Sequence, residues 1–171
     1  MYRLVACCGY VGCSIWMLSV DTGRAILVVE AILKHKERLA GVHPELIRLI
    51  EKLDKIFPLI IVSGFRSLAD QHILYKQGRD GDHNPIVTYA DGGSSPHNYG
   101  LSVDIAPDPL NWNDLKRFDL MRSLGEVVAR EIGVSVDWGG SWPGKKCDRP
   151  HVQISDWKNK KEWQCQPTKK N

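Results

Sequence analysis

The stretch SSPHNYGLSVDIAP, residues 94–107, places a histidine and an aspartate seven positions apart around a glycine. In its second half, LSVDIA, apolar residues alternate with small or polar ones, which predicts a β-strand that carries Asp104 on the face opposite the aliphatic side chains. A turn over residues 98–100 would bring His97 back beside that strand. These residues therefore predict a polar site on one face of a sheet.

The same alternation returns further along the chain in HVQIS, residues 151–155. Its two aliphatic residues point one way and His151 points the other, so two strands of one sheet could offer His151 and Asp104 to the same cleft. With His97 as a third ligand, two imidazoles and one carboxylate leave the fourth tetrahedral position open for water, as in a catalytic zinc site. The carboxylate of Asp148, three residues before His151, could act as a general base beside that water.

Each of these residues also has an ordinary structural interpretation. A histidine and an aspartate in a loop rich in glycine and serine commonly form a hydrogen-bonded pair or a cap. Arg66 could be a surface ion-pair partner, Asp148 a turn residue, and Trp138 and Trp142 core or rim aromatics. The order of several such features along one chain favours a site over these separate explanations.

The remaining elements are predicted from apolar spacing and capping residues. The chain predicts three helices, over residues 44–57, 67–77 and 113–133. A short buried strand, residues 59–64, precedes the second helix, so Arg66 lies at a strand-to-helix junction, where functional side chains often project. Residues 78–96 predict a long functional loop with a possible short strand, IVTYA.

Composition limits the class of protein. A chain of 171 residues is long enough for one domain with a hydrophobic core and short for two. Hydrophobic residues make up 43% and charged residues 25%, which argues against wholesale disorder. The net charge of +3 comes without the basic stripes of a nucleic-acid-binding protein, so no nucleic-acid partner is expected.

The two ends of the chain differ from its middle. Residues 4–20 carry no charge, so residues 1–20 are predicted to be a signal, a membrane anchor or a core element, unless translation starts at Met17. Residues 158–171 are predicted to be a basic tail. The segment between them, residues 21–157, would be the folded domain.

The five cysteines give no zinc-ribbon spacing. Cys147 and Cys165 could form a disulfide in an oxidising compartment, but the odd total makes free thiols an equal alternative.

Four segments together resemble a known family. In order and spacing, SGFRSLADQHILYKQGR, IVTYADGGSSPHNYGLSVDIAP, VDWGGSW and DRPHVQI resemble the zinc-dependent peptidoglycan peptidases of the LAS group over about residues 40–156. That group includes the L-alanyl-D-glutamate endopeptidases of phages and bacteria and the VanX and VanY D,D-peptidases. The resemblance implies an α+β fold, with helices on one face of a small antiparallel sheet and a zinc cleft on the other, as in the hedgehog and D,D-peptidase folds.

The resemblance also implies roles for individual residues. In the family, zinc is held by the residues that match His97, Asp104 and His151. Asp148 matches the catalytic base, and Arg66 matches an arginine that steadies the carbonyl oxygen as negative charge develops. Substrate contacts are expected at four further positions, Gln71, Ser95, Trp138 and Trp142.

The implied function is hydrolysis of peptidoglycan stem peptides with Zn²⁺ as cofactor. Aspartate at position 148 together with the WGGSW segment, residues 138–142, favours the L-Ala-D-Glu bond, because the D,D-peptidases more often have glutamate at that position. One alternative is a D-alanyl-D-alanine carboxypeptidase or dipeptidase of the same fold. Another is a zinc-stabilised wall-binding module without catalysis.

The resemblance also carries expectations about where the protein works. A monomer is expected, with membrane contact possible through residues 4–20. The expected location is the cell envelope or the wall after secretion, or a host cytoplasm with holin-dependent release if the gene belongs to a phage.

Overall fold

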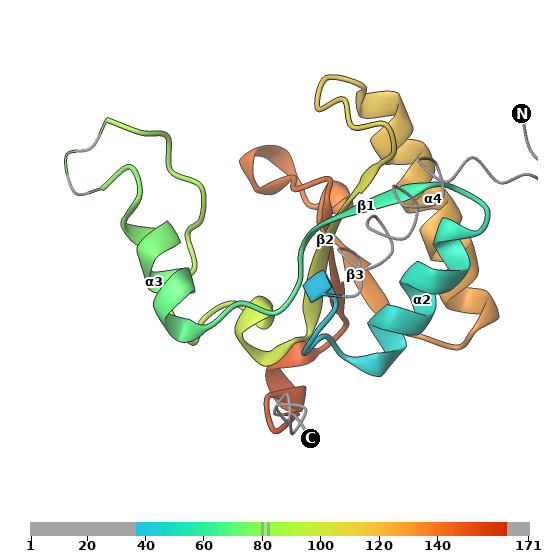
Figure 1. Cartoon of the computed structure of the whole chain (residues 1–171), viewed down its shortest axis with the longest axis horizontal. Coiled ribbons are helices and arrows are strands. Elements are labelled where there is room, and N and C mark those ends of the chain that lie inside the picture. Colours follow the sequence, from blue (N-terminus) through green and yellow to red (C-terminus); the bar gives the residue numbers. More distant parts are fainter. Residues whose placement is uncertain (1–36, 80, 82, 164–171) are drawn as a thin grey trace, which may run out of the picture.

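The computed structural model describes residues 37–79, 81 and 83–163 (Figure 1). The predicted signal or anchor, residues 1–20, and Cys165 lie outside these residues. In the part of the chain that is described, no helix is long and apolar enough to cross a membrane.

A four-stranded antiparallel sheet forms the centre of the fold, with the strand order β1-β2-β4-β3. Its strands are β1 (Leu59–Ser63), β2 (Ser102–Pro107), β3 (Val136–Trp138) and β4 (His151–Ile154). The two segments with alternating residues become neighbours, because β2 pairs with β4 and Asp104 lies directly opposite His151. The predicted adjacency of these strands is therefore confirmed.

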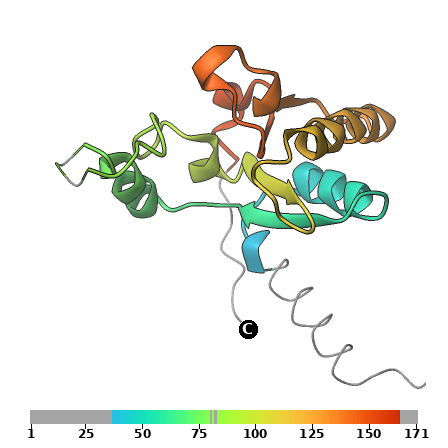
Figure 2. The same cartoon turned by 90° about the horizontal axis from the view of Figure 1, so that it is seen from above.

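Two helices, α2 (Pro44–Asp54) and α4 (Leu115–Glu131), pack against each other and cover one face of the sheet (Figures 1 and 2). The third, α3 (Leu68–Lys76), lies away from the sheet on an arm that continues into the loop after it. The structure thus has the predicted α+β class, with helices on one face of a small antiparallel sheet.

The core fills the space between the two packed helices and the sheet. Its fully buried side chains come from α2, α4 and the aliphatic positions of the strands, including Leu46, Leu53, Phe118, Met121, Val103, Ile105 and Val152. One detail of the prediction is wrong: α2 ends at Asp54, not at residue 57, so Ile56 lies in the following turn and is 59% exposed. Helical spacing no longer applies once the helix has ended.

Capping residues set the other helix ends as predicted. The Ser67 hydroxyl accepts a hydrogen bond from the Asp70 backbone N–H at the start of α3, and the Asp114 carboxylate accepts one from Arg117 at the start of α4. Gly133, two residues after α4, has a positive φ of 70° and ends that helix in the left-handed conformation.

The predicted strand IVTYA is absent from the described structure, because residues 86–90 have no strand partner. Side chains hold this segment instead. Gln71 donates to the Ala90 carbonyl at 2.6 Å, and Arg79 donates to the Thr88 carbonyl at 3.1 Å. The segment is therefore fastened to α3 and the residues after it, and not to the sheet.

Gly125 in α4 provides a test of core packing. A Cβ at this position would overlap the ring of Trp138, which is only 3% exposed. Gly125→Ala is expected to lower the free energy of unfolding by about 1–3 kcal/mol, despite the better helix propensity of alanine, because the indole must shift in a filled core. Thermal and denaturant unfolding measure the change. Val127→Ala on the exposed side of the same helix is the control, and equal stability of the two variants would contradict the packing explanation.

Candidate active site

His97 is presented by a short 3₁₀-helix, Pro96–Tyr99, that leads into β2. The Ser95 hydroxyl accepts a hydrogen bond from the His97 backbone N–H at 3.4 Å and starts this turn. Gly100 ends it with a φ of 66°, where its backbone packs closely against Gly41 and leaves no room for a Cβ. The SPHNYG sequence therefore encodes a tight turn that returns His97 to the polar face of the sheet.

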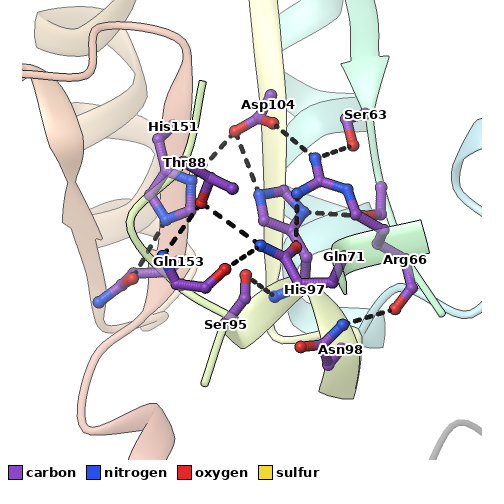
Figure 3. Close-up of polar contacts among 12 residues, drawn as sticks. Ser63, Arg66, Gln71, Thr88, Ser95, His97, Asn98, Asp104, His151 and Gln153 are labelled. Atoms are coloured by element: carbon purple, nitrogen blue, oxygen red, sulfur yellow. Dashed lines mark hydrogen bonds and ion pairs between the residues drawn. The ribbon is translucent and has the colours of Figure 1, made fainter. Parts of the chain in front are cut away.

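Three side chains that could ligate a metal meet on this face (Figure 3). Potential ligand atoms of His97, Asp104 and His151 all lie within 4.8 Å of one another. Asp104 Oδ1 is 3.3 Å from His97 Nε2 and 3.0 Å from His151 Nδ1. Both histidines are buried, whereas the aspartate is partly open to solvent. The predicted proximity of the three residues is confirmed.

In each histidine, the ring nitrogen that points away from Asp104 makes a hydrogen bond. This bond decides which nitrogen carries the proton and which keeps a lone pair. His97 Nδ1 lies 2.8 Å from the Gly64 carbonyl, which can only accept, so Nδ1 carries the proton and the Nε2 lone pair faces Asp104. His151 Nε2 lies 3.1 Å from Gln153 Oε1, which leaves the Nδ1 lone pair facing the same carboxylate. Such outer hydrogen bonds are what orient histidines that bind metals. The donor set, two oriented imidazoles and a carboxylate without thiolate, fits zinc.

Electrostatics in the cluster favour a negatively charged Asp104. In the absence of a metal ion, the histidine nitrogens that face Asp104 can carry protons in place of free lone pairs. Burial opposes ionisation of Asp104, but the hydrogen bonds that His151 and His97 then donate outweigh it and hold the pKa of Asp104 well below its usual range. Burial likewise disfavours a charged His151, yet the hydrogen bond and charge of Asp104 raise the pKa of that imidazole. Protons and a metal ion would therefore compete for the same nitrogen.

Arg66 borders the cluster from the junction between β1 and α3 (Figure 3). Its guanidinium donates to Gln71 Oε1 at 2.7 Å and to Ser63 Oγ at 3.0 Å, and it lies 3.8 Å from Asp104 Oδ2. Its backbone N–H donates to the His97 carbonyl at 3.1 Å, which joins the two loops. The arginine is thus held in one orientation beside the candidate metal ligands.

Asp148 lies in the turn that leads into β4. Its backbone N–H donates to the Gly139 carbonyl at 2.9 Å, and its own carbonyl accepts from the His151 N–H at 3.2 Å. A Cβ on Gly139 would overlap this turn, which explains why the WGG sequence suits the position. Asp148 is exposed, but desolvation by the surrounding residues and the negative charge of Asp104 raise the pKa of its carboxyl group, and the two histidines oppose that shift. The carboxyl group of Asp148 therefore binds a proton more tightly than an isolated aspartate side chain does.

The candidate ligands and their charged neighbours line a cleft with a volume of about 830 Å³. Arg66, the three candidate ligands, Asp148 and two predicted contact residues, Ser95 and Trp142, line it. Residues 86–90 and 145–147 form further parts of its wall. A smaller hollow of about 480 Å³ at the end of α4, between Glu126 and Val136, has no comparable group of ligands.

The structure corrects two predicted substrate contacts. Trp138 does not line the cleft, because β3 points its side chain into the core against α4. Gln71 is fully buried. Both polar atoms of its side-chain amide are used in hydrogen bonds, which involve Arg66, Thr88 and the Ala90 carbonyl. Gln71 therefore positions Arg66 and the 86–90 segment, and has no free surface for a substrate.

Sequence reasoning missed the hydrogen-bond chain behind His151. Gln153 accepts from His151 and donates to Asp137 Oδ2 at 3.4 Å, and the other oxygen of Asp137 accepts from the Ser155 hydroxyl at 2.8 Å. The alternation in HVQIS already puts Gln153 on the same face as His151. That signal could have identified the partner, although Asp137 comes from a different strand.

A sequence model of the family described as phage L-alanyl-D-glutamate peptidase matches residues 31–158. The chain is 39% identical over 111 residues to the peptidoglycan L-alanyl-D-glutamate endopeptidase CwlK of Bacillus subtilis; the match covers 59% of this chain and 63% of that protein. It is 28% identical over 112 residues to the L-alanyl-D-glutamate peptidase of Escherichia phage T5, covering 63% of this chain and 77% of the phage protein.

A solved structure is also similar. The crystal structure of the Serratia marcescens L-Ala D-Glu endopeptidase ChiX matches with a TM-score of 0.57 and 29% sequence identity. The match covers 71% of this chain and 86% of that one.

Proposed function

Because the chain belongs to the family of phage L-alanyl-D-glutamate peptidases, we propose that it is a zinc-dependent endopeptidase that cleaves the L-Ala-D-Glu bond of peptidoglycan stem peptides. The observation that carries this proposal is the meeting of His97, Asp104 and His151 in one cleft that Arg66 and Asp148 also line. The names of the relatives from Bacillus subtilis and phage T5 support the choice of bond.

His97 Nε2, His151 Nδ1 and Asp104 would hold the zinc ion. These residues fit a zinc ion because two imidazole lone pairs are directed toward one carboxylate. Hydrogen bonds from the opposite ring nitrogens to Gly64 and Gln153 keep the imidazoles in this orientation. When bound, zinc supplies Lewis-acid chemistry, which makes water a stronger acid and polarises a carbonyl group. Asp104 also balances part of the positive charge of the ion.

Asp148 would act as the general base and then as the general acid. Its carboxylate accepts a proton from the attacking water and later delivers that proton to the nitrogen of the leaving amine.

Arg66 would stabilise the negative charge that develops on the carbonyl oxygen. A fixed cation aimed at that oxygen lowers the barrier without reorganising during the reaction. Gln71 and Ser63 keep the guanidinium fixed by accepting two of its hydrogen bonds. The candidate ligands, Arg66 and Asp148 line one cleft of a single chain, so the proposed chemistry requires no residue from a second copy.

The products of peptidoglycan digestion test the proposal. Purified protein is incubated with purified peptidoglycan, with zinc or with a chelator, and the released fragments are identified by mass spectrometry. New amino-terminal D-glutamate that appears only with zinc is the expected result. Release of D-alanine would instead identify a D-alanyl-D-alanine carboxypeptidase, and binding without any release would identify a wall-binding module.

A further inference from the structure

Two lysines line the cleft close to Asp148. Lys145 and Lys146 lie in a short 3₁₀-helix, Gly144–Lys146, and both are exposed. Their ammonium groups form no hydrogen bond or ion pair with any residue of the described chain. Two positive charges without partners at the edge of a cleft attract an anionic group from solution.

The other cation of the cleft is already engaged. Arg66 donates to Gln71 and Ser63 and lies beside Asp104, on the β1 side of the cluster (Figure 3). Asp148 instead precedes β4, on the His151 side. Residues 86–90, which also line the cleft, include no charged side chain. An anion on the Asp148 side would therefore meet the lysines.

The proposed substrate carries such an anion, so the argument here rests on the proposed function. A glutamate residue whose nitrogen belongs to the cleaved bond has two carboxyl groups. The peptide continues through only one of them, and the other stays negative unless it is amidated. Both carboxyl groups are a few bonds from the nitrogen that leaves.

The position of the lysines matches this part of the substrate. If Asp148 returns a proton to the leaving nitrogen, the glutamate residue lies on the Asp148 side of the cleft. Lys146 is two residues from Asp148, so their Cα atoms are at most about 7.6 Å apart, and the long lysine side chain can cover the remaining distance. The positive pair would also offset the repulsion between Asp148 and a second carboxylate.

We propose that Lys145 and Lys146 bind the free carboxylate of the D-glutamate residue on the leaving side of the cleaved bond. The enzyme then prefers stem peptides in which this carboxylate is unmodified over those in which it is an amide. Amidation removes the negative charge, and a neutral carboxamide gains less from an ammonium group.

Two peptides test the preference. Both consist of N-acetylmuramic acid, L-alanine, D-glutamate joined through its side-chain carboxyl, and L-lysine, and they differ only in a free or an amidated α-carboxyl group. The wild-type protein with zinc is expected to cleave the free acid with a kcat/KM roughly tenfold higher than the amide, the difference that one charge-assisted hydrogen bond makes. The double variant Lys145→Gln/Lys146→Gln should cleave the free-acid peptide with a kcat/KM roughly tenfold lower than that of the wild type, and its kcat/KM on the amidated peptide should be unchanged.

A matched variant controls for net charge. Lys158 and Lys160 occupy another exposed 3₁₀-helix, Trp157–Lys160, and do not line the cleft. Lys158→Gln/Lys160→Gln removes the same charge and should keep the wild-type preference. An equal loss in both double variants, or an equal loss on both peptides, would overturn the role of the lysine pair.

The peptides also separate this inference from the function on which it rests. If the wild-type protein cleaves both peptides equally well at the L-Ala-D-Glu bond, the lysine role is wrong and the proposed function stands. If it cleaves neither peptide at that bond but releases D-alanine from whole peptidoglycan, the proposed function is wrong and the inference fails with it.

Discussion

An Asp148→Asn protein is expected to lose about 10²- to 10⁴-fold in kcat, the usual contribution of a positioned acid–base group. Asparagine has nearly the same size and keeps the backbone hydrogen bonds of the turn to Gly139 and His151. It cannot accept the proton of the attacking water or return one to the leaving nitrogen. The variant should therefore still fold and bind zinc, which metal analysis and circular dichroism check alongside the rate of peptide release.

Asp108→Asn is the matched control for this variant. Asp108 follows β2 at its far end, is exposed and lies outside the cleft. Its replacement changes the net charge by the same amount and should leave the rate within about twofold of wild type, as is usual for surface substitutions. If Asp148→Asn kept full activity with bound zinc, the general base would have to be another group.

Removal of zinc is expected to reduce peptide release to the level without enzyme and to lower the melting temperature. Without the ion, the water loses its activating charge, and the cluster keeps only the hydrogen bonds between Asp104 and its two histidines. An ion present at about 1,000 times its Kd adds about 4 kcal/mol to the free energy of unfolding. Activity and melting temperature are measured after chelation and again after zinc is returned.

Two histidine variants show whether this effect belongs to the cluster. His97→Ala removes one candidate ligand and should abolish both the activity and the zinc-dependent rise in melting temperature. His72→Ala removes an exposed histidine that lies 2.8 Å from Asp91, outside the cluster, and should behave as wild type. Full activity of a zinc-free wild-type protein would refute a catalytic metal.

Local patterns were sufficient where the decisive interactions are local. The alternation in LSVDIA and HVQIS predicted two strands and the faces of their polar residues, since successive side chains of a strand point to opposite sides. Ser67 and Asp114 predicted helix starts because a cap bonds within its own turn. The same patterns failed at Ile56, where helical spacing continued for a few residues beyond the end of the helix.

Local sequence patterns did not predict the contacts between residues that are far apart in the chain. Trp138 and Trp142 are four positions apart in one aromatic segment, yet one packs in the core and the other lines the cleft. Gln71 was expected to contact substrate but is buried against Arg66 and the 86–90 segment. Which neighbour each side chain meets depends on how the elements pack, and no local pattern carries that information.

By itself, the sequence determined the chemical types of the candidate ligands, the faces of their strands and the family to which the chain belongs. Only the tertiary structure decided that Asp104 lies opposite His151, that Gly64 and Gln153 orient the two imidazoles, and that the lysine pair shares the cleft with Asp148. The physical reason is the range of the interactions. Side-chain alternation and capping act within a few residues, whereas antiparallel register brings together residues far apart in the chain.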